Sequence, residues 1–176
     1  LQNVLKLGAG VDFNEDECKR LVRVYREVND KVIQLWQECD NALADIASWP
    51  EGKEPYYIGE GECVMITPKG IKLPNGLYIY YPDLEWDTSE TKSRYTYKRR
   101  NGKVGIWGGG MVENIVQALA RIVIGEQMIN ISDKYRPALT VHDAIVCVAA
   151  DKDKDDALNY IMAEMSTPPG WAKDCP

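Results

Sequence analysis

The sequence contains one histidine, no long apolar run and no paired cysteines, and each absence disfavours a class of protein. A metal phosphohydrolase of the histidine–aspartate type needs several histidines, whereas these 176 residues include one. No apolar run approaches the ~20 residues that span a bilayer, and the first residues lack the layout of a signal peptide. We therefore expect no membrane association and a cytoplasmic location. Because the chain begins at Leu1 rather than methionine, we also expect a piece of a longer protein.

The sequence also lacks the residue patterns of disulfide frameworks, zinc sites and phosphate-binding loops. The five cysteines are scattered without a C-x-x-C pair, which favours reduced thiols over a disulfide framework or a zinc site. The glycine run at 108–110 is not followed by the Lys-Ser/Thr of a phosphate-binding loop, so a self-contained nucleotide-binding enzyme lacks support. Positive charge is scarce, since 21 basic residues face 27 acidic ones and the net charge is −6. Bulk attraction to nucleic acid is thus disfavoured, although a local basic patch or bound cations would permit binding.

The length and composition, with 45% hydrophobic and 27% charged residues, predict one medium-sized globular domain. Asn14 and Glu17 have the spacing of a capping box, and apolar residues then recur at steps of three and four. We expect one continuous helix of about nine turns, ending at Trp49-Pro50, whose apolar stripe packs on the core. The stripe comprises Leu21, Tyr25, Val28, Val32, Leu35, Cys39, Ala42 and Ile46.

Glycines, prolines and tyrosines between residues 51 and 103 indicate short strands and turns. The segment containing Asn75-Gly76 joins the apolar runs 63–66 and 77–81, and Asn-Gly is a strong hairpin signal. A second predicted hairpin, 95–106, has four cations near its tip: Lys98, Arg99, Arg100 and Lys103. This cluster would either grip phosphates or form a solvated turn, and the sequence favours neither.

A glycine-led helix over residues 111–125 is apolar around nearly its whole circumference, which predicts a buried helix. Its polar exceptions, Asn114, Gln117 and Arg121, are three and four residues apart and therefore share one face. Such a line forms either a surface that reads or clamps a ligand or an internal polar network. An amphipathic helix over residues 151–165 is expected to cover the hairpin that precedes it.

That hairpin consists of two apolar, strand-like runs within residues 138–149, interrupted only by His142 and Asp143. Desolvating a carboxylate is costly unless a metal ion or a donor compensates it. An ionisable pair at the break between two buried strands therefore predicts a metal-binding hairpin tip. The alternative is a polar turn in which Asp143 satisfies backbone amides.

These segments resemble, in order and spacing, the C-terminal part of phage-type family A DNA polymerases. The resemblance is carried by residues 109–121, 139–143 and 165–172, with Leu73-Pro74-Asn75-Gly76 and residues 80–84 similar to that family's connection between fingers and palm. It implies an α+β fold in which long helices pack with a small antiparallel sheet as part of the fingers and palm. The parts would be a helical fingers-derived segment (1–56), a β-rich connection (57–107) and the C-terminal palm (108–176).

In that family the hairpin aspartate, here Asp143, is one of two carboxylates that hold catalytic Mg²⁺ ions for template-directed nucleotidyl transfer. The resemblance places His142 beside the primer terminus. It places the polar helix residues against new base pairs or the template backbone, most firmly Gln117, then Asn114 and Arg121. It implies primer–template DNA and deoxynucleoside triphosphates as partners, in a host cell's cytoplasm if a phage encodes the chain.

The family's first catalytic aspartate and its triphosphate-binding helix would precede Leu1. We therefore expect this chain to need the N-terminal remainder of the polymerase and to be inactive alone. The chain also departs from the family pattern, with Ala144 where glutamate follows His-Asp, Leu77 and Tyr78 in a strand that usually bears arginine, and Ile122 in place of an aspartate. These departures leave a second reading open, a noncatalytic DNA-binding or scaffold module that retains a palm-like fold.

Overall fold

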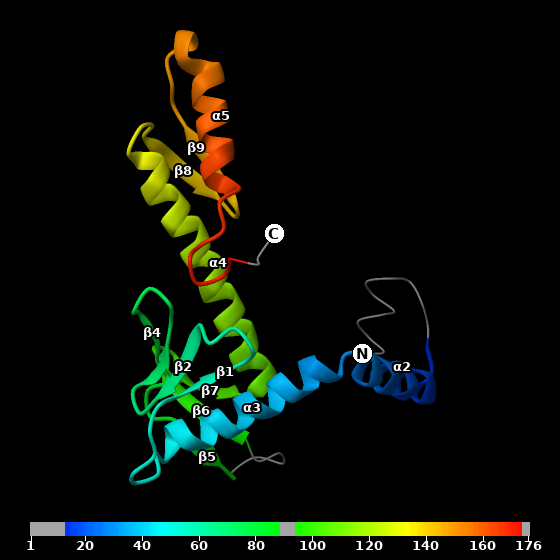
Figure 1. The fold of residues 1–176 in the computed structure, drawn as a ribbon. Helices are drawn as coiled ribbons and strands as arrows, with labels where there is room; N and C mark the ends of the chain where they lie inside the picture. The colour runs from blue at the N-terminus through cyan, green and yellow to red at the C-terminus, as the bar shows by residue number, and fades with distance from the viewer. Residues whose placement is uncertain (1–12, 89–93, 174–176) are drawn as a thin grey trace.

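The structure of the protein, a computed structural model, describes residues 13–88 and 94–173, so the expectations for the first residues and for Cys175 lie outside it. One lobe holds a helix and two small sheets, and another holds a hairpin and the last helix (Figure 1). The long helix α4 (Gly108–Ser132) joins the two lobes. This is the predicted α+β fold of long helices with small antiparallel sheets. None of the described helices has the length and apolarity to cross a membrane.

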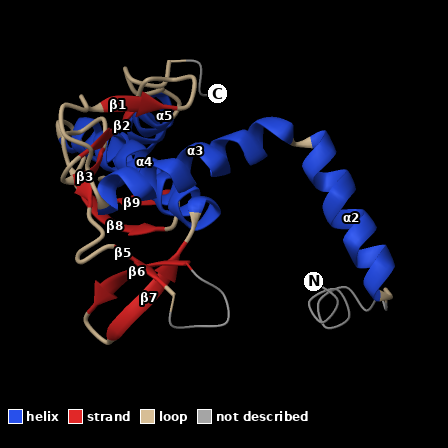
Figure 2. Cartoon of the chain, turned by 90° about the horizontal axis from the view of Figure 1, so that it is seen from below, coloured by secondary structure: helices blue, strands red, loops and turns tan. Residues whose placement is uncertain are grey.

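Two helices, α2 (Glu15–Val28) and α3 (Asp30–Ala47), occupy the region where the sequence predicts one. They are separated at Asn29, whose side-chain amide donates a hydrogen bond to the Tyr25 carbonyl at 2.8 Å. Asparagine is unfavourable inside a helix because its side chain competes for such backbone groups. The prediction of one continuous helix is wrong for this local reason, and α2 projects away from the rest of the chain (Figure 2).

The capping box at the start of α2 is confirmed. The Glu17 amide donates to Asn14 Oδ1 at 2.9 Å, and the Asn14 amide donates to the Glu17 carboxylate at 2.8 Å. The apolar stripe, by contrast, divides at the break between the helices. Cys39 on α3 is fully buried, whereas Tyr25 and Val28 on α2 are exposed. Core packing of the stripe is therefore confirmed for α3 and wrong for the end of α2.

A four-stranded antiparallel sheet packs against α3 in the order β1 (Tyr56–Ile58), β2 (Val64–Thr67), β3 (Gly70–Lys72) and β4 (Tyr78–Ile79). The predicted hairpin joined the runs around β2 and β4 directly, but β3 lies between them. The Asn-Gly turn connects β3 to β4. Gly70 permits the additional strand because its φ is 125° and a Cβ there would collide with the Ile79 carbonyl.

The second predicted hairpin is confirmed as β6 (Arg94–Arg99) and β7 (Gly102–Ile106), and β5 (Glu85–Asp87) adds a third antiparallel strand. Helix α4 then begins at Gly108, within the glycine run rather than after it. A Cβ on Gly108 would collide with the Trp36 carbonyl of α3. Glycine thus allows the first turn of α4 to lie directly against α3.

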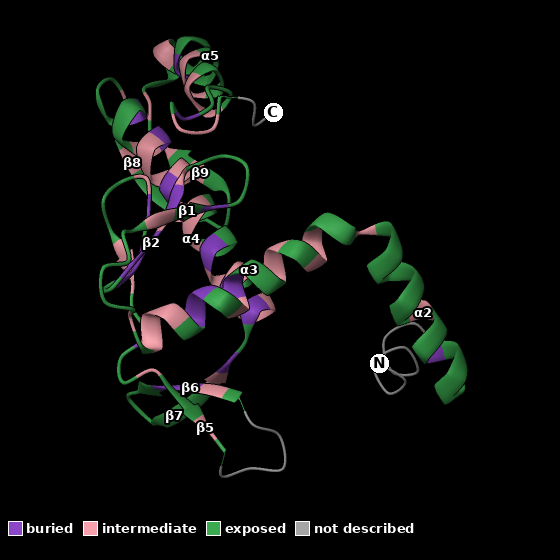
Figure 3. Cartoon of the chain, turned by 60° about the horizontal axis from the view of Figure 1, so that its bottom comes forward, coloured by how far each residue is buried: buried purple, intermediate pink, exposed green. Residues whose placement is uncertain are grey.

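One hydrophobic core joins α3, both sheets and the first half of α4, and it draws residues from all three predicted segments. Buried residues cluster on the parts of α3 and α4 that meet and on strands beside them (Figure 3). Met111 and Ile115 of α4 are buried there, but Val116 and Ile129 are 57% and 67% exposed. The expectation that α4 is buried all round is wrong for this chain, because the neighbouring elements cover only part of its circumference.

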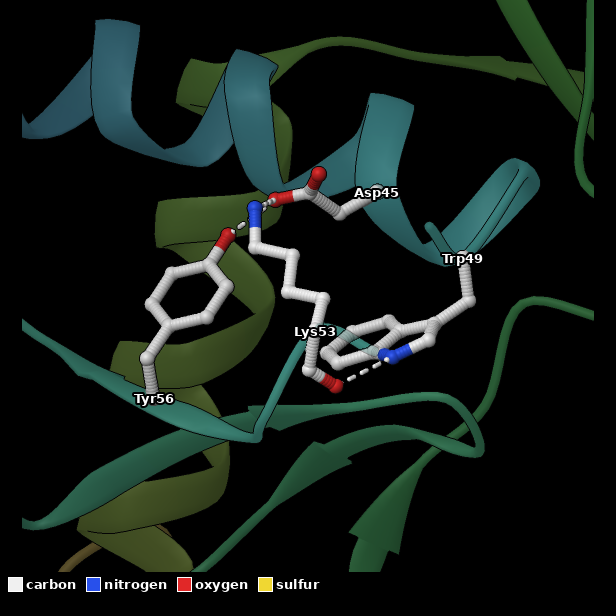
Figure 4. Close-up of polar contacts among 4 residues, drawn as sticks. All are labelled: Asp45, Trp49, Lys53 and Tyr56. Atoms are coloured by element: carbon white, nitrogen blue, oxygen red, sulfur yellow. Dashed lines mark hydrogen bonds and ion pairs between the residues drawn. The ribbon is translucent and has the colours of Figure 1, made fainter. Parts of the chain in front are cut away.

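A polar cluster fastens the end of α3 to β1 (Figure 4). The Asp45 carboxylate accepts a hydrogen bond from the Tyr56 hydroxyl at 2.5 Å and pairs with Lys53 Nζ at 2.7 Å. The Trp49 indole donates to the Lys53 carbonyl at 2.9 Å. Burial raises the pKa of Asp45, but the hydrogen bonds from Lys53 and Tyr56 and the lysine charge outweigh it and leave the pKa below its usual value. The cluster therefore favours an ionised Asp45.

The other lobe contains β8 (Pro137–Val141), β9 (Ala144–Cys147), a 3₁₀ turn (Asp151–Asp153) and α5 (Lys154–Met165). Gln127 Nε2 donates to the carbonyl of the last α5 residue at 2.8 Å, and the Tyr160 hydroxyl donates to the Asn130 carbonyl at 3.1 Å. These bonds fix α5 on α4. The helix itself is confirmed, but its main packing partner is α4 rather than the hairpin it was expected to cover.

Candidate nucleic-acid interface

The β8–β9 hairpin presents His142 and Asp143 at its tip. Val141 pairs with Ala144, so these two residues form the whole loop. His142 adopts a φ of 54°, a left-handed conformation that suits a two-residue hairpin and that histidine tolerates better than most residues. Both tip residues are exposed, which confirms the predicted hairpin with an accessible Asp143.

Asp143 does not serve as a cap for its own turn. Within the described residues its carboxylate accepts no hydrogen bond, whereas the polar-turn alternative required bonds from backbone amides. The hairpin instead leaves a charged, solvated carboxylate at its end. This geometry leaves the carboxylate oxygens open to a cation.

The two strands that end at the tip, β8 and β9, carry apolar side chains that are partly exposed to solvent. Leu139, Val141 and Val146 are 52%, 54% and 43% exposed. Leu139 pairs with Val146, and Val141 lies two residues along the same strand, so all three side chains share one face. The expectation of two buried strands is wrong for this chain, because α4 contacts β8 and this outer apolar face lies open.

The described residues do not form a metal site by themselves. Among them, no group of three or more histidine, cysteine, aspartate or glutamate side chains could hold a metal ion. Asp143 therefore brings a single carboxylate. Mg²⁺ uses one or two protein carboxylates together with substrate phosphates and water, so Asp143 would fit one ligand position and not a complete site.

The three polar residues of α4 have different surroundings. Asn114 is half-buried, and its Nδ2 donates a hydrogen bond to the Tyr81 hydroxyl at 3.1 Å. Burial raises the pKa of Tyr81 to about 12, so the hydroxyl stays protonated at neutral pH. Gln117 is exposed and donates to Glu113 on the same helix at 3.2 Å. The internal-network alternative thus describes Asn114, while Gln117 and Arg121 lie at the surface.

Arg121 lies at an apolar groove between α4 and the turn that joins β3 to β4. The groove has a volume of about 360 Å³. Its lining residues come from two segments far apart in the sequence: Leu73, Asn75 and Leu77 from the turn, and Ala118, Arg121, Ile122, Gly125, Glu126 and Ile129 from α4. Arg121 therefore adjoins apolar surface on the side of α4 that carries Gln117.

The basic tip of the β6–β7 hairpin is partly neutralised. Lys103 pairs with the Glu85 carboxylate, and Lys98 Nζ lies 3.7 Å from Asp83. The Glu85 hydrogen bond and charge raise the pKa of Lys103. Arg99 lies over the Tyr97 ring at 5.8 Å. The structure therefore favours a solvated, internally paired turn for the two lysines, a pairing that requires the β5–β6–β7 register and is not visible in the sequence.

The fold and the hairpin tip define an α+β protein that carries a solvent-facing carboxylate on a two-residue loop and polar side chains on an exposed part of its longest helix. The chain is 31% identical, over 186 aligned positions, to the DNA polymerase of Bacillus phage SP02. The alignment covers 98% of this chain and 28% of that polymerase, so the chain spans little more than a quarter of its relative. No family model and no solved structure matches the chain.

Proposed function

We propose that this chain is the C-terminal fingers-to-palm part of a longer, phage-type family A DNA polymerase, in which Asp143 contributes to the nucleotidyl-transfer site. The observation that carries the proposal is the unpaired carboxylate of Asp143 at an exposed hairpin tip. The similarity of almost the whole chain to a phage DNA polymerase supports it. The partners would be primer–template DNA, deoxynucleoside triphosphates and the N-terminal remainder of the polymerase.

In this proposal the chain supplies one of the carboxylates for Mg²⁺, and a second comes from outside the chain. The ion would stabilise charge that develops during transfer. The two-residue loop fixes Asp143 at the end of a paired hairpin, which limits the carboxylate to a small set of positions. His142, in the same loop, would lie beside the primer terminus.

The surroundings of the hairpin are consistent with an incomplete site. Leu139, Val141 and Val146 form an apolar face that a further element would cover. We infer that this element belongs to the polymerase remainder and brings the second carboxylate near the tip. Gln117 and Arg121 would contact DNA directly, whereas Asn114 would position α4 through its bond to Tyr81.

A second function has a specific observation in its favour. Ala144 stands where the resembled family has a glutamate, and Leu77 and Tyr78 stand where arginine is usual. Fewer carboxylates and cations would suit a noncatalytic DNA-binding or scaffold module. The two functions differ in whether the charge of Asp143 is needed for chemistry.

The deciding experiment replaces Asp143 with asparagine in the longer polymerase that contains this segment. We expect primer extension with Mg²⁺ to fall about a hundredfold or more, since loss of a residue that only hydrogen-bonds a metal ligand already costs up to that much. Asp133→Asn, which removes an equal charge from the exposed end of α4, is the matched control and should extend normally. Wild-type extension by Asp143→Asn would contradict the catalytic proposal and favour the noncatalytic module.

A further inference from the structure

The four-stranded sheet has an open face whose side chains the hairpin site does not use. The register pairs Tyr57 with Met65, Met65 with Lys72, and Lys72 with Tyr78. Directly paired residues point to the same face of a sheet, so these side chains form one row across all four strands. The other face carries the buried residues Ile58, Val64, Ile66 and Ile71, which belong to the core.

Aromatic rings stand at both ends of this row. Tyr57 on the first strand is 49% exposed. At the other end, Tyr78 stacks on Tyr80 with ring centroids 5.6 Å apart and an angle of 20° between the planes, and Tyr80 is 57% exposed. Lys72 is exposed between the two ends and forms no ion pair within the described residues. The row therefore combines accessible ring faces with a free cation.

A hollow of about 250 Å³ lies on this face. Tyr57, Met65 and Lys72 line it from the sheet, and Trp171 lines it from the segment after α5. The indole of Trp171 is held in place by donating a hydrogen bond to the Glu126 carboxylate at 3.2 Å. Glu62 also lines the hollow and supplies a hydrogen-bond acceptor. A space of this size, with two aromatic residues in its lining, admits one flat nucleobase.

We propose that this face is a stacking platform for unpaired nucleotides of single-stranded DNA. One base enters the hollow beside Tyr57 and Trp171, another stacks on the Tyr78–Tyr80 pair, and Lys72 lies by the intervening phosphates. With strands about 4.8 Å apart, the row is roughly 14 Å across, which is enough for a few nucleotides. Exposed aromatic rings with an interspersed cation are typical of single-strand binding.

This inference rests on the proposed function, because it names unpaired template as the ligand of the sheet face. The platform also predicts that the chain binds single strands more tightly than duplex. In a duplex the base faces are already stacked on one another, and a net charge of −6 weakens attraction to phosphates. Stacking on rings depends much less on net charge, so single strands are the ligand favoured by this face.

The test is fluorescence anisotropy of a labelled oligo-dT titrated with the 176-residue chain, compared with a duplex of equal length. We expect tighter binding of the single strand, and about fivefold or more weakening by Tyr57→Leu or Trp171→Leu. Trp86→Leu is the matched control, because Trp86 is 54% exposed but lies on β5 of the other sheet. Lys72→Gln should reduce the salt dependence of binding.

Three outcomes would overturn the platform: equal binding of single strand and duplex, equal weakening by Trp86→Leu and Tyr57→Leu, or no weakening by Tyr57→Leu. Thermal unfolding verifies that each variant folds, and Tyr80→Leu, beyond the end of β4, replaces any variant that does not. Oligo-dT binding that is unaffected by Tyr57→Leu, together with lost extension in Asp143→Asn, contradicts the platform alone. Preferential oligo-dT binding that Tyr57→Leu weakens, together with normal extension by Asp143→Asn, contradicts the catalytic proposal alone.

Discussion

Asn114 of α4 and Tyr81, after β4, are joined by a hydrogen bond of 3.1 Å from the amide to the phenolic hydroxyl. Tyr81 is buried and packs edge-on against Tyr97 of β6. The bond therefore ties the long helix to both sheets at the centre of the core. Asn114, which the polymerase resemblance places against DNA, thus also has a structural role within the fold.

Replacing Asn114 by alanine should destabilise the fold. It leaves the buried Tyr81 hydroxyl without a partner, which costs about 1–3 kcal/mol. Tyr81→Phe removes the hydroxyl itself, so no buried hydroxyl is left without a partner, and it should cost less stability than Asn114→Ala. Urea unfolding of both variants and of the double variant checks this, since the double variant should be less destabilised than the sum of the single ones. An unchanged unfolding midpoint in Asn114→Ala would show that the hydroxyl is satisfied otherwise.

Alanine substitutions at two glycines of α4, Gly108 and Gly125, should change stability in opposite directions. At Gly108 a Cβ meets the backbone carbonyl of Trp36, which cannot move aside as a flexible side chain can, so Gly108→Ala should cost about 1–3 kcal/mol. At Gly125 no atom lies within 4 Å of an added Cβ, so Gly125→Ala should stabilise by about 0.5–1 kcal/mol through helix propensity. Thermal unfolding of the two variants measures the contrast. Destabilisation of equal size at both positions would argue against the close contact of α3 and α4.

The Asp45 cluster should make stability depend on acid. The folded pKa of Asp45 is lowered, so its contribution is present above the ordinary aspartate pKa of about 3.9 and is lost as the pH falls through the folded value. Asp45→Asn should therefore be less stable than wild type at neutral pH, and this difference should shrink toward pH 3. Urea unfolding as a function of pH gives the comparison. A difference that is constant across this range would mean that the ionised carboxylate is not the stabilising form.

Much of the fold could be predicted from local signals. The capping box at Asn14, the hairpin of residues 95–106 and the His142-Asp143 tip each depend on a few neighbouring residues, and each is found. The break at Asn29 is not predicted because apolar periodicity continues through it. At the break, the backbone amide and the side-chain amide of Asn29 both donate to the Tyr25 carbonyl, and the backbone of Asn29 leaves the helical conformation.

The candidate sites depend on contacts between distant residues, which one sequence does not reveal. The spacing of Asn114, Gln117 and Arg121 predicts a shared helix face, but the different role of Asn114 requires the position of Tyr81. Likewise, alternation in the strands places Tyr57 and Tyr78 off the core face, whereas nothing in the sequence places Trp171 beside Tyr57. These contacts are set by tertiary packing and the register of the sheet.

Gln117 provides the sharpest test of the surface of α4. It is exposed, and its bond to Glu113 is an ordinary helix contact worth a few tenths of a kcal/mol, so Gln117→Ala should barely change stability. In the longer polymerase we expect it to contact DNA near the primer end, where misplacement slows chemistry steeply. Extension should then fall about tenfold or more, a loss of ~1.4 kcal/mol in the transition state.

Gln37→Ala is the matched control, because Gln37 is an exposed glutamine of α3 that also bonds a residue one turn away. If Gln117→Ala and Gln37→Ala extend primers at the same rate, or if Gln117→Ala loses only thermal stability, the exposed part of this helix face has no role at the primer end.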